Sequence, residues 1–290
     1  MALTKKTIVL GTTILIIALV GSIFLFWTLN HSKSTHPLSD PLPQQTARKE
    51  APVSITSKQK SLPKHQGKLS IIIVGLGLFP ELTDQVLNLS DQVMLGYYSQ
   101  SPEVKEQIEK AISKGFDVYM MCPMEPVYYP QNDPGPNTLL TGLPKEENLK
   151  RLDDILNIYP SITGLVSYQG SLFMTSEEDL SPVIQSLKSK NKTFIDTSNA
   201  PQSKTQSVCN EQKATCYQTQ FQLDQELSSE ALKKMFKEVE KSLETHDHVI
   251  VFGFAYPITI EAISEWLKDN ASKFSLEKLS ASPSSVESSK

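Results

Sequence analysis

Histidine is scarce in this chain of 290 residues, which contains five. Three of them, His31, His36 and His65, lie in a polar N-terminal stretch. His246 and His248 precede an apolar run, and we therefore expect them at the end of a sheet opposite the strand C-termini, where parallel α/β folds place their chemistry. A hydrolytic zinc site needs several convergent ligands, and a Ser-His-Asp triad needs a histidine beside its serine. The shortage argues against both sites.

Cysteine is almost as rare, with three residues. Cys209 and Cys216 flank the polar segment CNEQKATC and could close a local disulfide in an oxidising compartment, although sequence does not fix the geometry that the bond requires. Cys122 follows the apolar run VYMM, with no histidine in a nearby motif to activate it. We expect a small buried hydrophobe at this position rather than a nucleophile.

A glycine-rich phosphate loop is also missing. The strand-like run KLSIIIVGLGLFPELT supplies Gly75 and Gly77, but Pro80 stands where a dinucleotide motif needs its third glycine. No acidic residue closes a second strand about 20 residues further on, where a ribose would need one. The pattern therefore argues against a nucleotide cofactor.

Positive charge is depleted from most of the chain. Residues 1–68 carry nine Lys and Arg against two acids, a balance of +7, whereas residues 69–290 carry nineteen against thirty, a balance of −11. An acidic folded region lacks the positively charged surface that nucleic-acid binding requires. The basic N-terminal part could touch phospholipid head groups, but a solvated linker explains it equally simply.

One long apolar run is present, at residues 7–30. It is long enough to cross a bilayer as a helix, Trp27 lies near its far end, and no A-x-A cleavage site follows it. Lys5 and Lys6 precede it and favour a cytoplasmic N-terminus. We expect a cytoplasmic segment at 1–6, an anchor at 7–30 and a disordered Ser-, Pro- and Lys-rich tether at 31–67.

From residue 68 to 282, short apolar runs alternate with amphipathic stretches, and a polar tail follows at 283–290. This alternation predicts an α/β fold of parallel strands with helices outside them, either barrel-like or doubly wound. The residues around the two cysteines are predicted as a loop, and residues 217–223 as one strand. The strand ends to inspect for chemistry are Val74-Gly75, Met121-Cys122, Ser167-Tyr168, Asp196 and Phe254.

The segment CPMEPVYYPQNDPGPNTLLTGLPKEENLKRL resembles the divergent polysaccharide deacetylase family, with its Leu-Pro-Met-Glu-Pro segment and Pro-Gly-Pro turn. The resemblance continues in order through GLVSYQGSLFM, TFIDTS, FQLD and VIVFGFAYPITIEAISEW, and spans about residues 68–282. It implies an irregular (β/α) barrel. For an active member it implies a carbohydrate deacetylase that uses a divalent metal such as zinc.

The positions at which the family carries its catalytic and metal-binding groups are substituted here. Two aspartates correspond to Val74 and Gly75, and three histidines correspond to Met121, Tyr168 and Phe254. A thioether is a poor zinc ligand, and one phenol cannot hold a hydrolytic metal. The resemblance therefore implies a chain with no catalytic residue, metal or cofactor at these positions.

Other residues match the family around the expected groove. Possible binding residues are Glu125, Tyr168, Ser171, Asp196 and Asp224, and Tyr128 and Tyr129 could offer faces for sugar stacking. Retention for folding alone explains these matches as well.

The expected protein is a single-pass protein of a bacterial inner membrane whose periplasmic domain has lost hydrolase activity and binds an envelope glycan or a periplasmic protein. One alternative is an active deacetylase built on Glu125, Asp196 and Asp224. Another is an envelope scaffold that binds no sugar.

Overall fold

The computed structural model describes residues 67–100 and 103–279, which belong to one compact unit, Ser61–Lys290. The expected cytoplasmic segment, the anchor at 7–30, nearly all of the tether and the polar tail lie outside the described residues. Within the described ranges, no helix has both the length and the apolar character that a membrane span requires.

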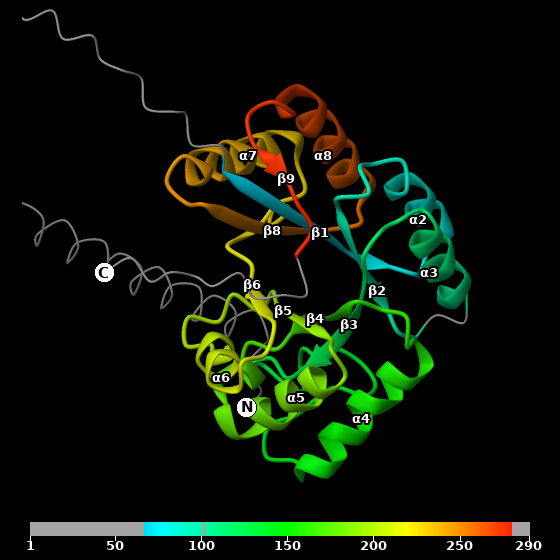
Figure 1. Cartoon of the computed structure of the whole chain (residues 1–290), viewed down its shortest axis with the longest axis vertical. Helices are drawn as coiled ribbons and strands as arrows, with labels where there is room; N and C mark the ends of the chain where they lie inside the picture. Colours follow the sequence, from blue (N-terminus) through cyan, green and yellow to red (C-terminus); the bar gives the residue numbers. More distant parts are fainter. Residues whose placement is uncertain (1–66, 101–102, 280–290) are drawn as a thin grey trace, which may run out of the picture. The chain divides into compact units, whose positions relative to one another are not determined.

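Parallel strands alternate with helices along the described chain (Figure 1). The strands are β1 Lys68–Leu76, β2 Met94–Tyr98, β3 Val118–Met124, β4 Gly164–Gln169, β5 Thr193–Asp196, β6 Cys216–Gln218, β7 Phe221–Gln222, β8 His248–Phe254 and β9 Ser275–Leu276. The helices are α2 Pro80–Val86, α3 Val104–Ser113, α4 Lys145–Ile158, α5 Glu177–Ser189, α6 Thr205–Gln212, α7 Ser229–Leu243 and α8 Pro257–Asn270, with the 3-10 turn η1 at Phe173–Thr175. Serine side chains cap the N-termini of two helices: Ser176 Oγ accepts a hydrogen bond from Asp179 N at α5, and Ser228 Oγ accepts one from Ala231 N at α7.

The strands form one curved sheet in the order β6-β5-β4-β3-β2-β1-β8-β7, with β9 added at the start of β1. Its two edges belong to β6 and β7, which are only two residues apart in the sequence. Thr219 N donates to Asp196 O on one edge, and Gln220 N donates to Ile250 O beside the other. The chain therefore crosses the open side of a half-barrel (Figure 1).

Alternation along each strand divides the buried side chains into two groups. On β1, Ile71 and Ile73 face the helices, whereas Ile72 and Val74 belong to a smaller cluster with Met94, Tyr119, Met121, Val166, Ile195, Ile250 and Phe252. This smaller cluster fills the interior of the half-barrel. Because the strands are parallel, their C-terminal ends meet at one end of this interior, here called the mouth, and their starts meet at the other end, here called the base.

The segment around the two cysteines differs from the sequence-based prediction. Cys209 lies in helix α6 rather than in a loop, and the predicted single strand at 217–223 is two short strands on opposite edges of the sheet. Gln220 explains the break, because its Oε1 accepts from Ile250 N while its own N donates to Ile250 O. A disulfide joins Cys209 to Cys216 and so links α6 to the start of β6.

Candidate functional site: the mouth of the half-barrel

The five substituted family positions come together at the mouth. Val74 pairs with Phe254 at the ends of β1 and β8, and Gly75 N donates to Met121 Sδ at 3.1 Å. A Cβ added to Gly75 would lie 3.2 Å from Phe254 Cδ1 and 3.8 Å from Tyr98 Cε2. Tyr98 in turn contacts Tyr168 edge to face, with 5.5 Å between ring centroids. Four strands therefore deliver these positions to a single place.

Aromatic rings dominate the mouth. Besides Tyr98 and Tyr168, Phe254 contacts the ring of Tyr256 at 6.0 Å between centroids. Burial raises the pKa of Tyr98, and the neighbouring hydroxyls of Tyr168 and Tyr256 raise it further. The sequence analysis did not single out Tyr98 or Tyr256, although each stands at or just beyond the end of a predicted strand.

The mouth is packed rather than hollow at its centre. Val74 is 3% exposed and Met121 is 1% exposed, while Tyr98, Tyr168 and Phe254 are half-buried. The oxygen ligands on offer are phenols, and the raised pKa of Tyr98 keeps its hydroxyl protonated at neutral pH. Across residues 67–100 and 103–279 no cluster of three or more His, Cys, Asp or Glu is arranged to hold a metal ion. These residues do not fit the divalent metal that the family implies.

Glu125 and Ser171 bind neighbouring loops. Glu125 Oε2 accepts hydrogen bonds from both the backbone N and the Oγ1 of Thr141, each at 2.6 Å. Ser171 Oγ accepts from Val127 N at 3.1 Å. Glu125 joins the two ends of the long segment 125–144, and Ser171 holds that segment against the loop after β4, so both side chains have a structural task.

Asp196, at the end of β5, is 2% exposed and organises the next loop. Its Oδ1 accepts from Ser198 N, and its Oδ2 accepts from Ser203 Oγ, Thr205 Oγ1 and Gln218 Nε2 at 2.7–3.1 Å. Four donors occupy the carboxylate, so its hydrogen-bonding capacity serves the start of α6 and the edge strand β6.

Asp224, 4% exposed, fixes the end of β8 beneath the mouth. Its Oδ2 accepts from Phe254 N at 2.6 Å and from Thr259 Oγ1 at 3.1 Å. Burial raises the pKa of Asp224, although these hydrogen bonds act in the opposite direction. Of the five possible binding residues, Tyr168 belongs to the aromatic mouth, and the other four place their side-chain oxygens in loop contacts.

Cys122 does not contribute a nucleophile to this site. It is fully buried, and burial raises the pKa of its thiol to about 12. Only the thiolate reacts readily, so this thiol is inert near neutral pH.

An open cavity of about 480 Å³ lies beside the Pro-Gly-Pro turn rather than at the centre of the mouth. Arg151 lies on its wall, with Nε donating to Glu147 Oε1 at 3.2 Å and Nη1 donating to Thr138 O. The remaining lining residues are Tyr129, Asp133, Gly135, Pro136 and Asn137. One aromatic ring among several hydrogen-bonding groups gives this cavity a polar character.

The base of the half-barrel contains a compact polar cluster. Ser70 Oγ donates to Glu277 O at 2.6 Å and lies 2.9 Å from His248 Nε2. Because the serine hydrogen is used by the carbonyl, His248 donates through Nε2 to the serine oxygen. Lys68 Nζ is paired with Glu277 Oε2 at 3.0 Å. His248 therefore lies at the end opposite the mouth, as its place before the strand predicts.

A parallel α/β half-barrel whose strand ends converge on one mouth defines the structural class of this protein. The model of the family described as divergent polysaccharide deacetylase matches residues 71–282, and the chain belongs to that family. Its relatives include YibQ, an uncharacterized protein of Escherichia coli K12, at 21% identity over 76% of this chain and 69% of YibQ. An uncharacterized protein of Haemophilus influenzae Rd is also 21% identical, over 70% of this chain and 72% of that protein.

A solved structure supports the same fold. The crystal structure of the uncharacterized protein ATU2773 from Agrobacterium tumefaciens C58 matches with a TM-score of 0.71 at 24% identity. The match covers 76% of this chain and 90% of that protein. At this identity the likeness bears on the fold alone.

Proposed function

We propose that this protein is a member of the divergent polysaccharide deacetylase family that recognises a ligand at the cell envelope and does not hydrolyse it. The observation that carries this proposal is the convergence of Val74, Gly75, Met121, Tyr168 and Phe254 at one packed mouth. The proposal takes these five positions as the family's site, with side chains in place of its ligands that cannot hold a hydrolytic metal.

The chemistry of deacetylation supports this proposal. Hydrolysis of an amide at neutral pH through a metal requires an ion that lowers the pKa of bound water. The mouth offers the thioether of Met121, which already accepts a hydrogen bond from Gly75 N, and the hydroxyl of Tyr98, whose raised pKa keeps it protonated. Glu125, Asp196 and Asp224, the alternative catalytic set, are each bonded to their own loops.

The proposal includes the location. Residues 7–30 anchor the chain in the inner membrane of a bacterium, with residues 1–6 in the cytoplasm and the half-barrel in the periplasm. Protease added to spheroplasts should then digest the half-barrel, and alkaline washing should leave the chain in the membrane fraction. Release by alkaline washing would contradict the anchor.

The deciding experiment measures zinc in the purified full chain, by elemental analysis and calorimetry, together with deacetylation of acetylated sugar oligomers. We expect neither stoichiometric zinc nor turnover in the natural chain. A matched variant, Met121→His with Tyr168→His and Phe254→His, should gain zinc binding, because it restores three imidazoles at positions that already converge. Tightly held zinc with turnover in the natural chain would overturn the proposal.

The cavity beside Arg151 favours a second candidate function, binding of an envelope glycan. Sugar hydroxyls suit a polar wall with one aromatic ring, as Tyr129, Asp133 and Asn137 provide. A glycan array on the full chain would test it, with Arg151→Ala and Tyr168→Ala separating the cavity from the mouth. Saturable binding lost in either variant favours this function, whereas no binding at all favours a protein partner or a scaffold role.

A further inference from the structure

Large apolar side chains are exposed in one part of the described chain. Six of them, across residues 67–100 and 103–279, are 43–71% exposed: Leu78, Phe79, Val127, Tyr128, Leu227 and Tyr256. All six follow the C-terminal ends of strands, after β1, β3, β7 and β8. Single exposed apolar residues are common on protein surfaces, but their restriction to one end marks that end as an interaction surface.

These six residues, here called the apolar rim, come from neighbouring loops. Strands β7, β8, β1, β2 and β3 are consecutive in the sheet, so the loops that follow them are neighbours around the mouth. Four strand spacings of about 4.8 Å make this arc roughly 19 Å long. A helix of about 13 residues has the same length.

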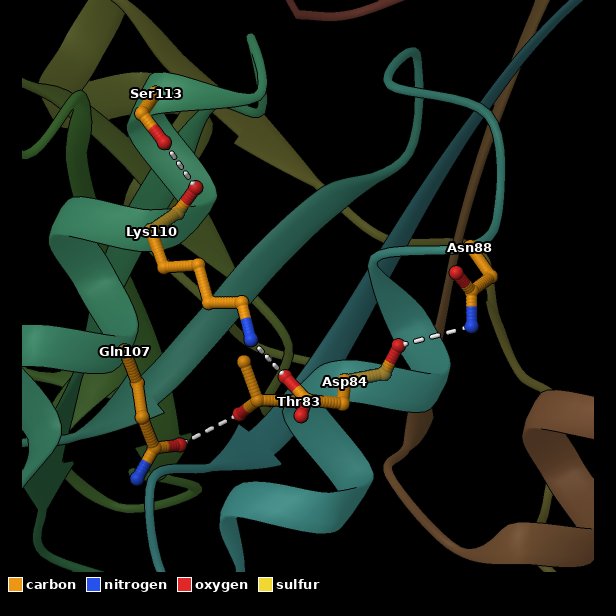
Figure 2. A network of polar contacts seen from close by, with 6 residues as sticks. All are labelled: Thr83, Asp84, Asn88, Gln107, Lys110 and Ser113. Carbon is orange, nitrogen blue, oxygen red and sulfur yellow. Dashed lines mark hydrogen bonds and ion pairs between the residues drawn. The ribbon is translucent and has the colours of Figure 1, made fainter.

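A polar network, buried at Thr83 and Gln107 and exposed at Asp84 and Lys110, holds the part of the rim that carries Leu78 and Phe79. Figure 2 shows Thr83 Oγ1 donating to Gln107 Oε1 at 2.6 Å and Lys110 Nζ paired with Asp84 between α2 and α3. The amide nitrogen of Gln107 also donates to Gly77 O at 3.2 Å, next to the two exposed residues. The loop is therefore fixed before any partner binds, which lowers the entropic cost of binding.

The same arc is acidic. The segments at 77–84, 99–100, 125–144, 223–230 and 255–261 contain no Lys or Arg, whereas the first turns of α3 and α4 carry one exposed lysine each, Lys105 and Lys145. The exposed acids of the arc include Glu81, Glu103, Asp133, Glu226, Glu230 and Glu261. Helix N-termini each offset about half a charge, which leaves the arc net negative. A complementary partner is apolar and basic, and an anionic membrane surface is disfavoured.

We propose that the apolar rim binds a protein segment of about 13 helical residues with an apolar face flanked by Lys and Arg. This inference rests on the proposed function, because it assigns a protein partner to a mouth that recognises rather than hydrolyses. The exposed aliphatic side chains Leu78, Val127 and Leu227 favour a protein over a sugar, which stacks on aromatic rings.

The test uses the full chain in detergent and a defined probe, a fluorescent amphipathic peptide of about 14 residues made of Leu and Lys. A Leu and Glu peptide of the same pattern is the charge control. We expect the Leu and Lys peptide to bind with an affinity that falls about tenfold between roughly 50 and 300 mM salt. Phe79→Ser with Tyr128→Ser should weaken binding by about tenfold or more, since both side chains are exposed and their removal leaves the core intact.

Two charge variants complete the design. Glu81→Gln with Glu226→Gln should weaken binding by about threefold and flatten its salt dependence, whereas Glu238→Gln, on the exposed face of α7, should change neither. Three results would each overturn the proposal: no binding at about 100 µM peptide, equal binding of the Leu and Glu peptide, or full binding by the Phe79 and Tyr128 variant. Binding of N-acetylglucosamine or glucosamine oligomers that the same variant abolishes, with no peptide binding, would also overturn it and assign the rim to a glycan. Zinc and turnover, measured on the same preparation, report separately on the proposed function.

Discussion

At the mouth of the half-barrel, Val74 near the end of β1 pairs with Phe254 at the end of β8, whereas at the base Ser70 and His248 lie near the starts of the same two strands. The mouth is filled by aliphatic, thioether and aromatic groups. The base keeps a serine, a histidine, a glutamate and a lysine in mutual contact.

The difference follows from what each end must satisfy. Ser70 is fully buried, but its hydroxyl has both a donor and an acceptor partner, so its burial costs little. A catalytic mouth instead needs ligand atoms that remain free for metal and substrate. Such unpaired polar atoms reduce the stability of the fold, so they are kept only where function requires them. Under the proposed function, which requires no hydrolysis, packed side chains at the mouth and paired polar groups at the base both satisfy the demands of burial.

The largest expected effect concerns the support beneath the mouth. Asp224→Ala leaves Phe254 N and Thr259 Oγ1 without their buried acceptor, and we expect unfolding free energy to fall by about 2–4 kcal/mol. Chemical denaturation of the full chain measures it.

Asp224→Asn is the matched control for this variant. Burial raises the pKa of Asp224, so the charge itself is disfavoured, and a neutral amide oxygen can still accept both hydrogen bonds. We expect the unfolding free energy of this variant to fall by less than about 1 kcal/mol. If the asparagine variant were as unstable as the alanine variant, the carboxylate charge would matter more than its hydrogen bonds.

A smaller effect tests how tightly the mouth is packed. Gly75 and Gly142 both have positive φ, at 86° and 73°, but an added Cβ meets Phe254 at 3.2 Å in the first case and nothing within 4 Å in the second. Gly142→Ala should lower the unfolding free energy by about 1 kcal/mol through backbone strain. Gly75→Ala should lower it further, because the Phe254 ring must also shift. Equal losses in thermal unfolding would mean that the mouth is looser than the structure indicates.

The sequence predicted much of the architecture because its signals are local. The alternation of apolar runs with amphipathic stretches identified most strands and helices, and the order of strand and helix predicted a parallel sheet. The break between β6 and β7 was missed, because it depends on Gln220 bonding to Ile250, a residue 30 positions away. Local periodicity cannot contain that information.

The candidate site was predictable only in part for the same reason. The resemblance supplied the five positions that meet at the mouth, including Tyr168. Tyr98 was missed, since its role comes from a ring contact with Tyr168 on another strand. Tyr256 was missed although its ring contacts that of Phe254, only two positions earlier. Glu125, Asp196 and Asp224 were correctly placed near strand ends, but their hydrogen-bond partners, such as Thr141 and Ser203, emerge only from the folded loops.

The smallest expected effect lies at the base and depends on pH. Burial lowers the pKa of His248 below its ordinary value of 6.5, Lys68 lowers it further, and Glu277 opposes them. The unfolded chain therefore binds a proton more readily than the folded chain, so stability should fall as the pH drops through 6.5. Lys68 lowers the pKa of Glu277, so protonation of Glu277 reduces the stability of the fold only at more acidic pH.

His248→Gln separates these groups. Glutamine keeps an N–H donor for Ser70 but does not titrate, so this variant should lose the decline in denaturation midpoint between about pH 8 and pH 6 and retain the decline below about pH 5. An unchanged decline near pH 6.5 would assign that titration to a group away from the base. The pKa values of Tyr98 and Asp224 at the mouth are raised in the folded chain, so neither group makes stability fall as the pH drops, and His248 at the base is the group expected to do so.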